Sequence, residues 1–318
     1  MLREALPLLL LDPKPTARQA AAAVLRQIAM PETFSPTMLR RARLVRNWLP
    51  GAELEPIDLA IRRARRQGVA CAHWAPPQAL TVQCSMPDGA GAQTLILTTA
   101  SGRAGVFAGL LLAQDFGIRD AWCDPARPRR DITDMLRQTR QEMQWQAVGR
   151  DYLDLVVQHH IARGWALGHL PQPAVLEIAE TVGAADWKGR CLDVAGETER
   201  LFATLGPAAD AAAALQRSGA WLAQVRMMRG WFDGDAAVRG LGAGAPAMPE
   251  AEPLPRREAW AERLLLLALW LRAGQGAATA PERWQDCVVL AQAVLAGRPL
   301  PDLPAKAFPG AAPPVTPR

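Results

Sequence analysis

The chain has 318 residues, of which 50% are hydrophobic and 21% are charged. This composition excludes an intrinsically disordered protein and is sufficient for one or two domains with a sizeable core. The net charge of +5 and the pI of about 9.3 are compatible with an anionic partner. However, abundant Ala, Arg, Gly and Pro are typical of a GC-rich bacterial genome, so the basic charge alone is weak support for nucleic-acid binding.

Three amphipathic helices are predicted in the first 68 residues, at 16–29, 37–49 and 56–67. Each has apolar residues at helical spacing and is bounded by proline or glycine. Pro31 ends the first helix, Pro50 and Gly51 end the second, and Gly68 is a C-cap for the third.

The only stretch with the character of β-structure begins after residue 69. Strands are predicted at 79–85, 94–99 and 106–112, and Asp88-Gly89 and Ser101-Gly102 are turn dipeptides between them. We therefore expect a small antiparallel sheet of about three strands within 79–112. The following segment, with Asp120 and Asp124 before Pro125, is interpreted as a turn.

Helical patterns resume at Arg129 and continue to about residue 222. Residues 234–256 are rich in Gly, Ala and Pro without periodicity, which predicts a linker or long loop. A final helical hairpin is expected within 257–296, and the proline-rich tail covers 297–318. The predicted fold is mainly α within the α+β class: a helical domain over 1–233 with the sheet inserted at 79–112, followed by the linker, the hairpin packed on that domain, and the tail.

A glycine loop after the second predicted strand has two interpretations. As a strand–loop–helix turn, its amides and arginine would bind a phosphate, and the chain would be a phosphate-ester enzyme. As a hairpin, it would only join two strands, and the strand formers Val106 and Phe107 favour this interpretation. Neither a Walker loop nor a dinucleotide fingerprint is present. The candidate phosphate-binding residues are Ser101, Gly102, Arg103 and Gly105.

No catalytic residue, metal site or cofactor is predicted from the remaining reactive side chains. His159 and His160 are adjacent on a helix, so they point about 100° apart and cannot chelate one ion together. His159 shares an apolar helical face, so it is expected to be a hydrogen-bonded core or interface residue. Cys123 lies between acidic residues, which disfavour a thiolate.

The other cysteines are also widely spaced, without a C-x-x-C pair, which excludes a disulfide scaffold and a zinc site. No apolar run approaches the roughly 20 residues that span a bilayer. We therefore expect a cytoplasmic protein that has no membrane partner.

Two arginine-rich helices are the strongest positive feature of the sequence. Their arginines could contact phosphates, and a tryptophan at the end of the first could stack on a base. A solvated or protein-binding face explains the same pattern. The candidate nucleic-acid or partner-binding residues are Arg40, Arg41, Arg43, Arg46, Trp48, Arg62, Arg63, Arg65 and Arg66.

The preferred function is therefore that of a non-enzymatic interaction or accessory protein with a protein partner. A nucleic-acid-binding protein that uses helices 37–49 and 56–67 is the alternative, and the phosphate-ester enzyme is a weaker one. Binding to DNA or RNA that depends on salt concentration separates the first two, and the structure of residues 106–112 tests the third.

Overall fold

The computed structural model describes residues 2–77, 79–99, 104–142, 145–184, 186–218, 254–274 and 282–297. The chain divides into two compact units. The first unit comprises residues 1–82, 95–138 and 153–191, and the second comprises 83–94, 139–152 and 192–318. The division into 1–233, 234–256, 257–296 and 297–318 stays a prediction.

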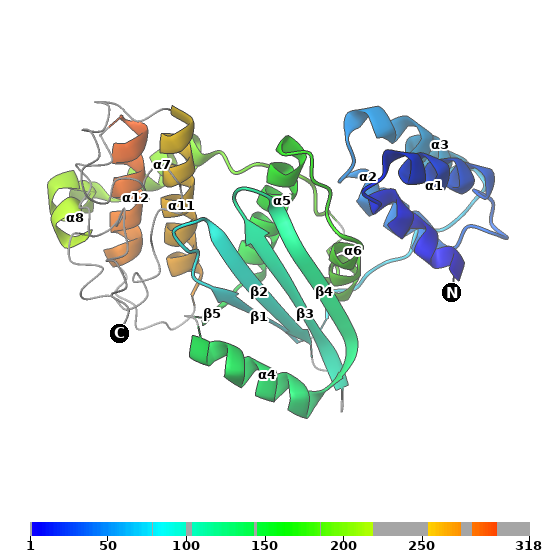
Figure 1. Ribbon diagram of the computed structural model, residues 1–318, viewed down its shortest axis with the longest axis horizontal. Helices are drawn as coiled ribbons and strands as arrows, with labels where there is room; N and C mark the ends of the chain where they lie inside the picture. The colour runs from blue at the N-terminus through cyan, green and yellow to red at the C-terminus, as the bar shows by residue number, and fades with distance from the viewer. Residues whose placement is uncertain are drawn as a thin grey trace, which may run out of the picture. The chain divides into compact units, whose positions relative to one another are not determined.

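The chain begins with a group of short helices in the first unit (Figure 1). They are η1 (Leu2–Leu11), α1 (Pro15–Gln27), α2 (Pro36–Arg46), η2 (Gly51–Glu53) and α3 (Leu54–Arg66). Proline occupies the first turn of α1 and α2, where its missing N–H costs nothing, and the Ser35 side chain accepts a hydrogen bond from the Met38 amide. These elements confirm the three helices predicted from the sequence.

The apolar stripes of these helices form a common core. Its members include Leu25, Met38, Val45, Trp48 and Ile57, all buried. This packing, more than helix propensity, stabilises helices as short as these.

The β-structure is one antiparallel sheet of five strands, in the order β4-β3-β2-β1-β5. Its strands are β1 (Leu80–Ser85), β2 (Ala92–Thr99), β3 (Ala104–Ala113), β4 (Gly117–Pro128) and β5 (Trp145–Val148). The prediction of about three strands was therefore too low. β4 contains the segment around Pro125 that we interpreted as a turn. As an edge strand it pairs on one side only, and proline is tolerated at such an edge.

The hairpin interpretation of the glycine loop is supported by its flanking strands. β2 and β3 are antiparallel neighbours, and the chain from Ala104 to Ala113 is a strand. Residues 100–103, which include the turn itself, lie outside the described residues.

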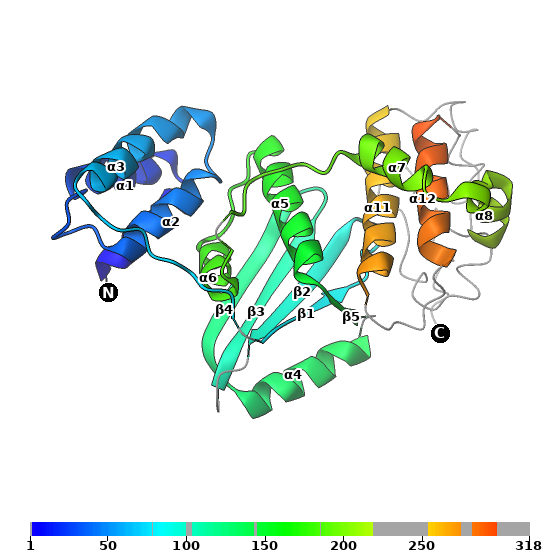
Figure 2. The same cartoon turned by 180° about the vertical axis from the view of Figure 1, so that it is seen from behind.

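Helices follow the sheet in sequence, as expected. They are α4 (Arg129–Glu142), α5 (Arg150–Ala166), α6 (Pro173–Val182), α7 (Val194–Phe202), η3 (Gly206–Ala209), α8 (Ala211–Ser218), α11 (Leu254–Ala273) and α12 (Glu282–Leu295). In the first unit, α6 packs on β4 and β3, and both views show α6 beside the edge strand (Figures 1 and 2).

The second unit contains the predicted C-terminal helical hairpin. α11 and α12 pack against each other, and α7 and α8 pack on α12 (Figure 2). Within the unit, the indole of Trp270 donates to the Cys84 carbonyl at 3.2 Å, and Arg217 forms a bidentate ion pair with the buried Asp286.

The boundaries around this hairpin differ in part from the prediction. α11 begins at Leu254, so the last residues of the predicted linker 234–256 are helical, and residues 234–253 lie outside the described part of the chain. Tail residues 298–318 also lie outside the described part of the chain. None of the helices in the described ranges has the length and apolar character of a membrane span.

Candidate partner-binding surface

The fold separates the arginines of the first helices into two groups, and the members of the first are held by carboxylates of the same chain. Arg18 pairs with Glu53 through bonds of 2.6 and 2.5 Å. Arg41 pairs with Glu180 at 3.0 and 2.6 Å, and it also donates to the Glu4 carbonyl at 2.7 Å. These fork-shaped contacts use the planar guanidinium fully and leave little of it for a partner.

Arg46 belongs to the same group, because it pairs with Asp58 of α3 at 2.8 and 3.1 Å. The hydrogen bond from Arg46 lowers the pKa of the Asp58 carboxyl, and the nearby charges of Arg46 and Arg62 add to this effect. Arg41 and Arg46 thus form ion pairs within the fold, and the expectation that they bind a partner stays a prediction.

Trp48 is completely buried, with none of its surface exposed. Its indole Nε1 donates to the Trp187 carbonyl at 3.0 Å, and its own carbonyl accepts from the indole of Trp165 at 2.5 Å. A ring in this position is not available to stack on a base, and a role of Trp48 in binding stays a prediction.

The second group of arginines lies on the outer face of α3. Arg62, Arg63, Arg65 and Arg66 are all exposed. None of them lies within ion-pair distance of a carboxylate in the part of the chain that the structure describes. Their charges are therefore open to solvent or to a partner.

Arg26 joins this group because α1 and α3 run side by side. Arg18 on α1 contacts Glu53 just before α3, and near the other end the Arg63 guanidinium lies 3.5 Å from the Arg26 carbonyl. The two helices therefore end together, and the exposed Arg26 lies at that end. We call the resulting set the basic cluster; its members are Arg26, Arg62, Arg63, Arg65 and Arg66.

Helix electrostatics explains part of this arrangement. Arg63, Arg65 and Arg66 occupy the last turn of α3, and Arg26 occupies the last turn of α1, where the helix dipole favours cations. Glu55 in the first turn of α3 is equally well placed. However, a single cation is enough to interact favourably with the dipole at a helix C-terminus. Each exposed charge there contributes only about 0.3–1 kcal/mol to stability. Three arginines on one turn exceed what stability requires.

The remaining candidate arginines, Arg40 and Arg43, belong to α2 and contact the segment that follows α3. The Arg40 guanidinium is 5.0 Å from the ring centre of Trp74, and Arg43 is 3.5 Å from the Cys71 sulfur. Because the Ala72 amide bonds to the Pro36 carbonyl, this segment is fixed against α2. Arg40 therefore stabilises local packing through a cation–π contact, and only Arg43 of this pair is exposed.

The phosphate-binding alternative loses its geometric basis. The strand–loop–helix interpretation requires a helix that begins after the loop, whereas β3 is extended from Ala104. Gly105 is explained by the close approach of the two strands, since a Cβ there would overlap the Thr99 carbonyl oxygen. Ser101, Gly102 and Arg103 lie outside the described residues.

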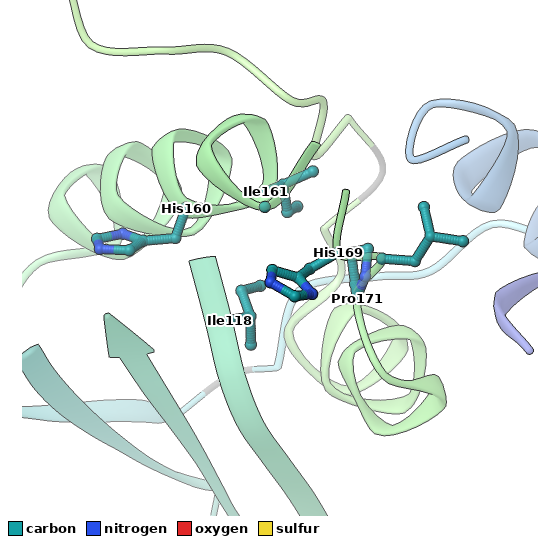
Figure 3. Close-up of a pocket in the computed structure, with 7 residues that line it drawn as sticks. Ile118, His160, Ile161, His169 and Pro171 are labelled. Carbon is teal, nitrogen blue, oxygen red and sulfur yellow. The ribbon is translucent and has the colours of Figure 1, made fainter. Parts of the chain in front are cut away.

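Two histidines, His160 and His169, are among the residues that line one small hollow (Figure 3). It has almost no enclosed volume, about 0 Å³, and is lined by Ile118, His160, Ile161, Gly164, His169, Leu170 and Pro171. Pockets that bind small molecules usually measure about 300–1,000 Å³. His160 bonds through Nδ1 to the Val156 carbonyl at 2.8 Å, and His169 stacks on Phe116 with ring centres 3.9 Å apart. Both histidines therefore have structural roles here.

His159 and His160 are both buried in α5, which favours the core alternative over the interface alternative for His159. Within the described ranges, no three His, Cys, Asp or Glu side chains gather as a metal ion would require. Burial raises the pKa of the Cys123 thiol, a hydrogen bond between Cys123 and Thr181 opposes this shift, and the carboxylates of Glu177 and Asp124 add to it. This environment is unsuited to a nucleophilic thiolate.

Two stretches of the chain match known families. Residues 1–68 match the Y4lR second domain, and residues 195–307 match the Y4lR C-terminal helical domain. Over 302 residues, or 90% of this chain, the sequence is 26% identical to a Sinorhizobium fredii (strain NBRC 101917 / NGR234) protein named "Uncharacterized protein y4lR". The match covers 57% of that protein, so the chain spans a little over half of its length. No solved structure gives a significant match.

The basic cluster lies entirely within the first matched stretch. Sequence reasoning identified four of its members but missed Arg26, because α1 reads as an alanine-rich helix with isolated charges. Only the side-by-side packing of α1 and α3 brings Arg26 to the others.

Proposed function

We propose that the chain is a non-enzymatic interaction protein that binds an acidic partner protein through the basic cluster. The observation that carries this proposal is the contrast between the two arginine groups. Arg18, Arg41 and Arg46 have carboxylate partners within the chain, whereas the arginines of the basic cluster are exposed without one among the described residues. Arginine is also enriched in protein interfaces, where its guanidinium can form two parallel hydrogen bonds to one carboxylate.

A cytoplasmic location is part of the proposal. All five cysteines are free, and Cys71 and Cys191 are exposed. Exposed thiols that remain reduced are typical of the cytoplasm, because oxidising compartments favour disulfides.

Nucleic-acid binding remains the second candidate. Unpaired arginines within a single helix turn are an electrostatic footprint that a phosphate backbone also fits. The burial of Trp48 speaks against a single-stranded ligand, because it removes the aromatic platform on which a base would stack.

The test uses the full chain and a cluster variant in which Arg62, Arg63, Arg65 and Arg66 are all replaced by Gln. A control variant replaces Arg119, Arg129, Arg130 and Arg190, which are exposed elsewhere in the first unit, with the same change in charge. Binding of labelled poly-L-glutamate and of a DNA duplex of about 20 base pairs is measured by fluorescence anisotropy across a salt series.

We expect poly-L-glutamate to bind the wild type and the control alike, and to bind the cluster variant at least about tenfold more weakly, a loss of about 1.4 kcal/mol. Equal affinity of the cluster and control variants would overturn the proposal. Tight duplex binding at physiological salt would instead select the nucleic-acid function. In that case, each lost phosphate contact should lower the log–log salt slope by about 0.9.

A further inference from the structure

The exposed face of α3 carries an apolar residue among its charges. Glu55, Leu59, Arg62 and Arg66 follow one another at helical spacing, so they form a single stripe along the outer side of the helix. Leu59 is 36% exposed in the middle of this stripe. One turn separates Leu59 from Arg62 and Arg63, or about 5 Å along the axis.

Two more apolar side chains are exposed near the end of α1, where Arg26 lies. Val24 and Met30 are each 41% exposed. Single exposed apolar residues are ordinary on a protein surface, but here three of the large exposed ones accompany the basic cluster on α1 and α3. Apolar contacts bordered by arginines have the composition of a protein interface.

The combination of exposed apolar and basic side chains on this surface distinguishes between the kinds of partner that could bind it. A phosphate backbone offers no apolar surface for Leu59 and is recognised by charge alone. An acidic amphipathic helix offers both: carboxylates one turn apart, about 5–6 Å, match the spacing of Arg62 and Arg66, and an apolar side chain one turn beyond the carboxylate that pairs with Arg62 can cover Leu59.

A second copy of the chain is a poor fit for the same surface. If two α3 helices paired antiparallel, Glu55 of each would face Arg66 of the other. In that register, however, Arg62 of each copy would face Leu59 of the other, so neither Leu59 would gain an apolar partner. The remaining Glu55–Arg66 pairs would be exposed, and such ion pairs contribute only about 0–1 kcal/mol each.

From these observations we infer that the partner's docking element is an acidic amphipathic helix. Its apolar side chain packs on Leu59, and its Asp or Glu residues pair with Arg62 and Arg66. This inference rests on the proposed function and adds to it the kind of structure that the basic cluster recognises. It assigns Leu59 to specificity and the arginines to attraction and orientation.

The probes are two synthetic helical peptides of about four turns. In the first peptide, the leucine peptide, glutamates at i,i+4 and leucines share one face of the helix. In the second, the serine peptide, every leucine is replaced by serine, so the net charge is the same. Both are titrated into the full chain and into the variants Leu59→Ser and Arg62→Gln/Arg66→Gln. Leu167→Ser, at an exposed leucine outside the surface, and Arg129→Gln/Arg130→Gln are the matched controls.

We expect Leu59→Ser to weaken binding of the leucine peptide by about fivefold, which corresponds to the loss of one partly buried leucine contact of about 1 kcal/mol. The Leu59→Ser variant and the wild type should bind the serine peptide with equal affinity. Arg62→Gln/Arg66→Gln should weaken both peptides, and neither control should weaken either one. All variants carry surface substitutions, so the circular dichroism spectrum of each should match that of the wild type.

Three results would overturn the inference. If the leucine peptide binds wild type and Leu59→Ser equally but still needs Arg62 and Arg66, the cluster recognises charge alone, and only the proposed function survives. If neither peptide depends on the arginines, both proposals are wrong. A wild-type dimer in sedimentation that Leu59→Ser dissociates would make a second copy the occupant.

Discussion

Trp48 and Trp187 are joined by a hydrogen bond of 3.0 Å from the Trp48 indole to the Trp187 carbonyl. The Trp187 indole in turn donates to the Asp154 carboxylate at 2.6 Å, and the Trp165 indole donates to the Trp48 carbonyl. The three tryptophans therefore connect the end of the second helix to α5 and to the segment after α6 within the first unit. An indole can do this because it carries one polar atom on a large apolar body.

Replacing Trp48 with Phe should destabilise the protein although the site stays filled by an aromatic ring. The substitution removes the N–H donor and leaves the buried Trp187 carbonyl without this bond, at a cost of about 1–3 kcal/mol. Trp48→Ala should cost more, about 3–5 kcal/mol, because it also leaves a cavity. The midpoint of urea denaturation measures both. A Phe variant as stable as the wild type would show that the bond contributes nothing.

The two arginine groups should respond oppositely to loss of charge. Arg41→Gln breaks a half-buried bidentate pair with Glu180 and a bond to the Glu4 carbonyl, so we expect a loss of about 1–3 kcal/mol. Arg62→Gln should change the free energy of unfolding by no more than about 0.5 kcal/mol, as at other exposed sites. Urea denaturation of both variants tests this contrast. Equal destabilisation would mean that Arg62 supports the fold and is not reserved for a partner.

Trp122 lies over Gly109, its cross-strand partner in the β3–β4 pair. A Cβ at Gly109 would lie 2.5 Å from the indole ring, so Gly109→Ala must displace Trp122 or separate the strands, at a cost of about 1–3 kcal/mol. Adding Trp122→Ala should make the same glycine substitution nearly neutral. A double-mutant cycle measures this coupling, and purely additive effects would contradict the contact.

Local signals predicted much of the fold. The helix at 56–67 was predicted closely because its apolar residues recur at helical spacing and Gly68, in a left-handed conformation, follows its end. β4 was missed because its prolines and aspartates resemble a turn, and only its position at the sheet edge makes them acceptable. β5 covers only Trp145–Val148, too short for an alternating pattern to be recognised.

The candidate surface was less predictable, because ion pairs join distant parts of the chain. Arg41 and its partner Glu180 are 139 residues apart, and no local pattern distinguishes Arg41 from Arg43. Trp48 presents the same difficulty, since its partner Trp187 is equally distant. Sequence reasoning identified the arginine concentration, and tertiary contacts decide which of its members remain exposed.

The Arg46–Asp58 pair should add stability that depends on pH. Bonding to Arg46 lowers the pKa of Asp58 in the folded protein below its value of about 3.9 in the unfolded chain. The stabilisation is therefore fully present above about pH 4 and is lost as the pH falls through the folded pKa. Because the Arg46 side chain is 39% exposed, the effect should stay below about 1 kcal/mol.

Unfolding of the wild type and Asp58→Asn in urea, at neutral pH and near pH 3, measures this pH dependence. The difference between the two proteins should be largest at neutral pH and shrink in acid. A difference that grows as the pH falls would contradict the assigned direction of the pKa shift.

Hydrogen–deuterium exchange of the full chain, with and without the leucine peptide, tests the central claim most directly, because it locates the bound surface without any substitution. We predict slower exchange at the end of α1 and in α3, from Leu54 to Arg66, with α4 and α6 unchanged. Protection confined to other elements, with α3 unaffected at saturating peptide, would show that the basic cluster is not the docking surface.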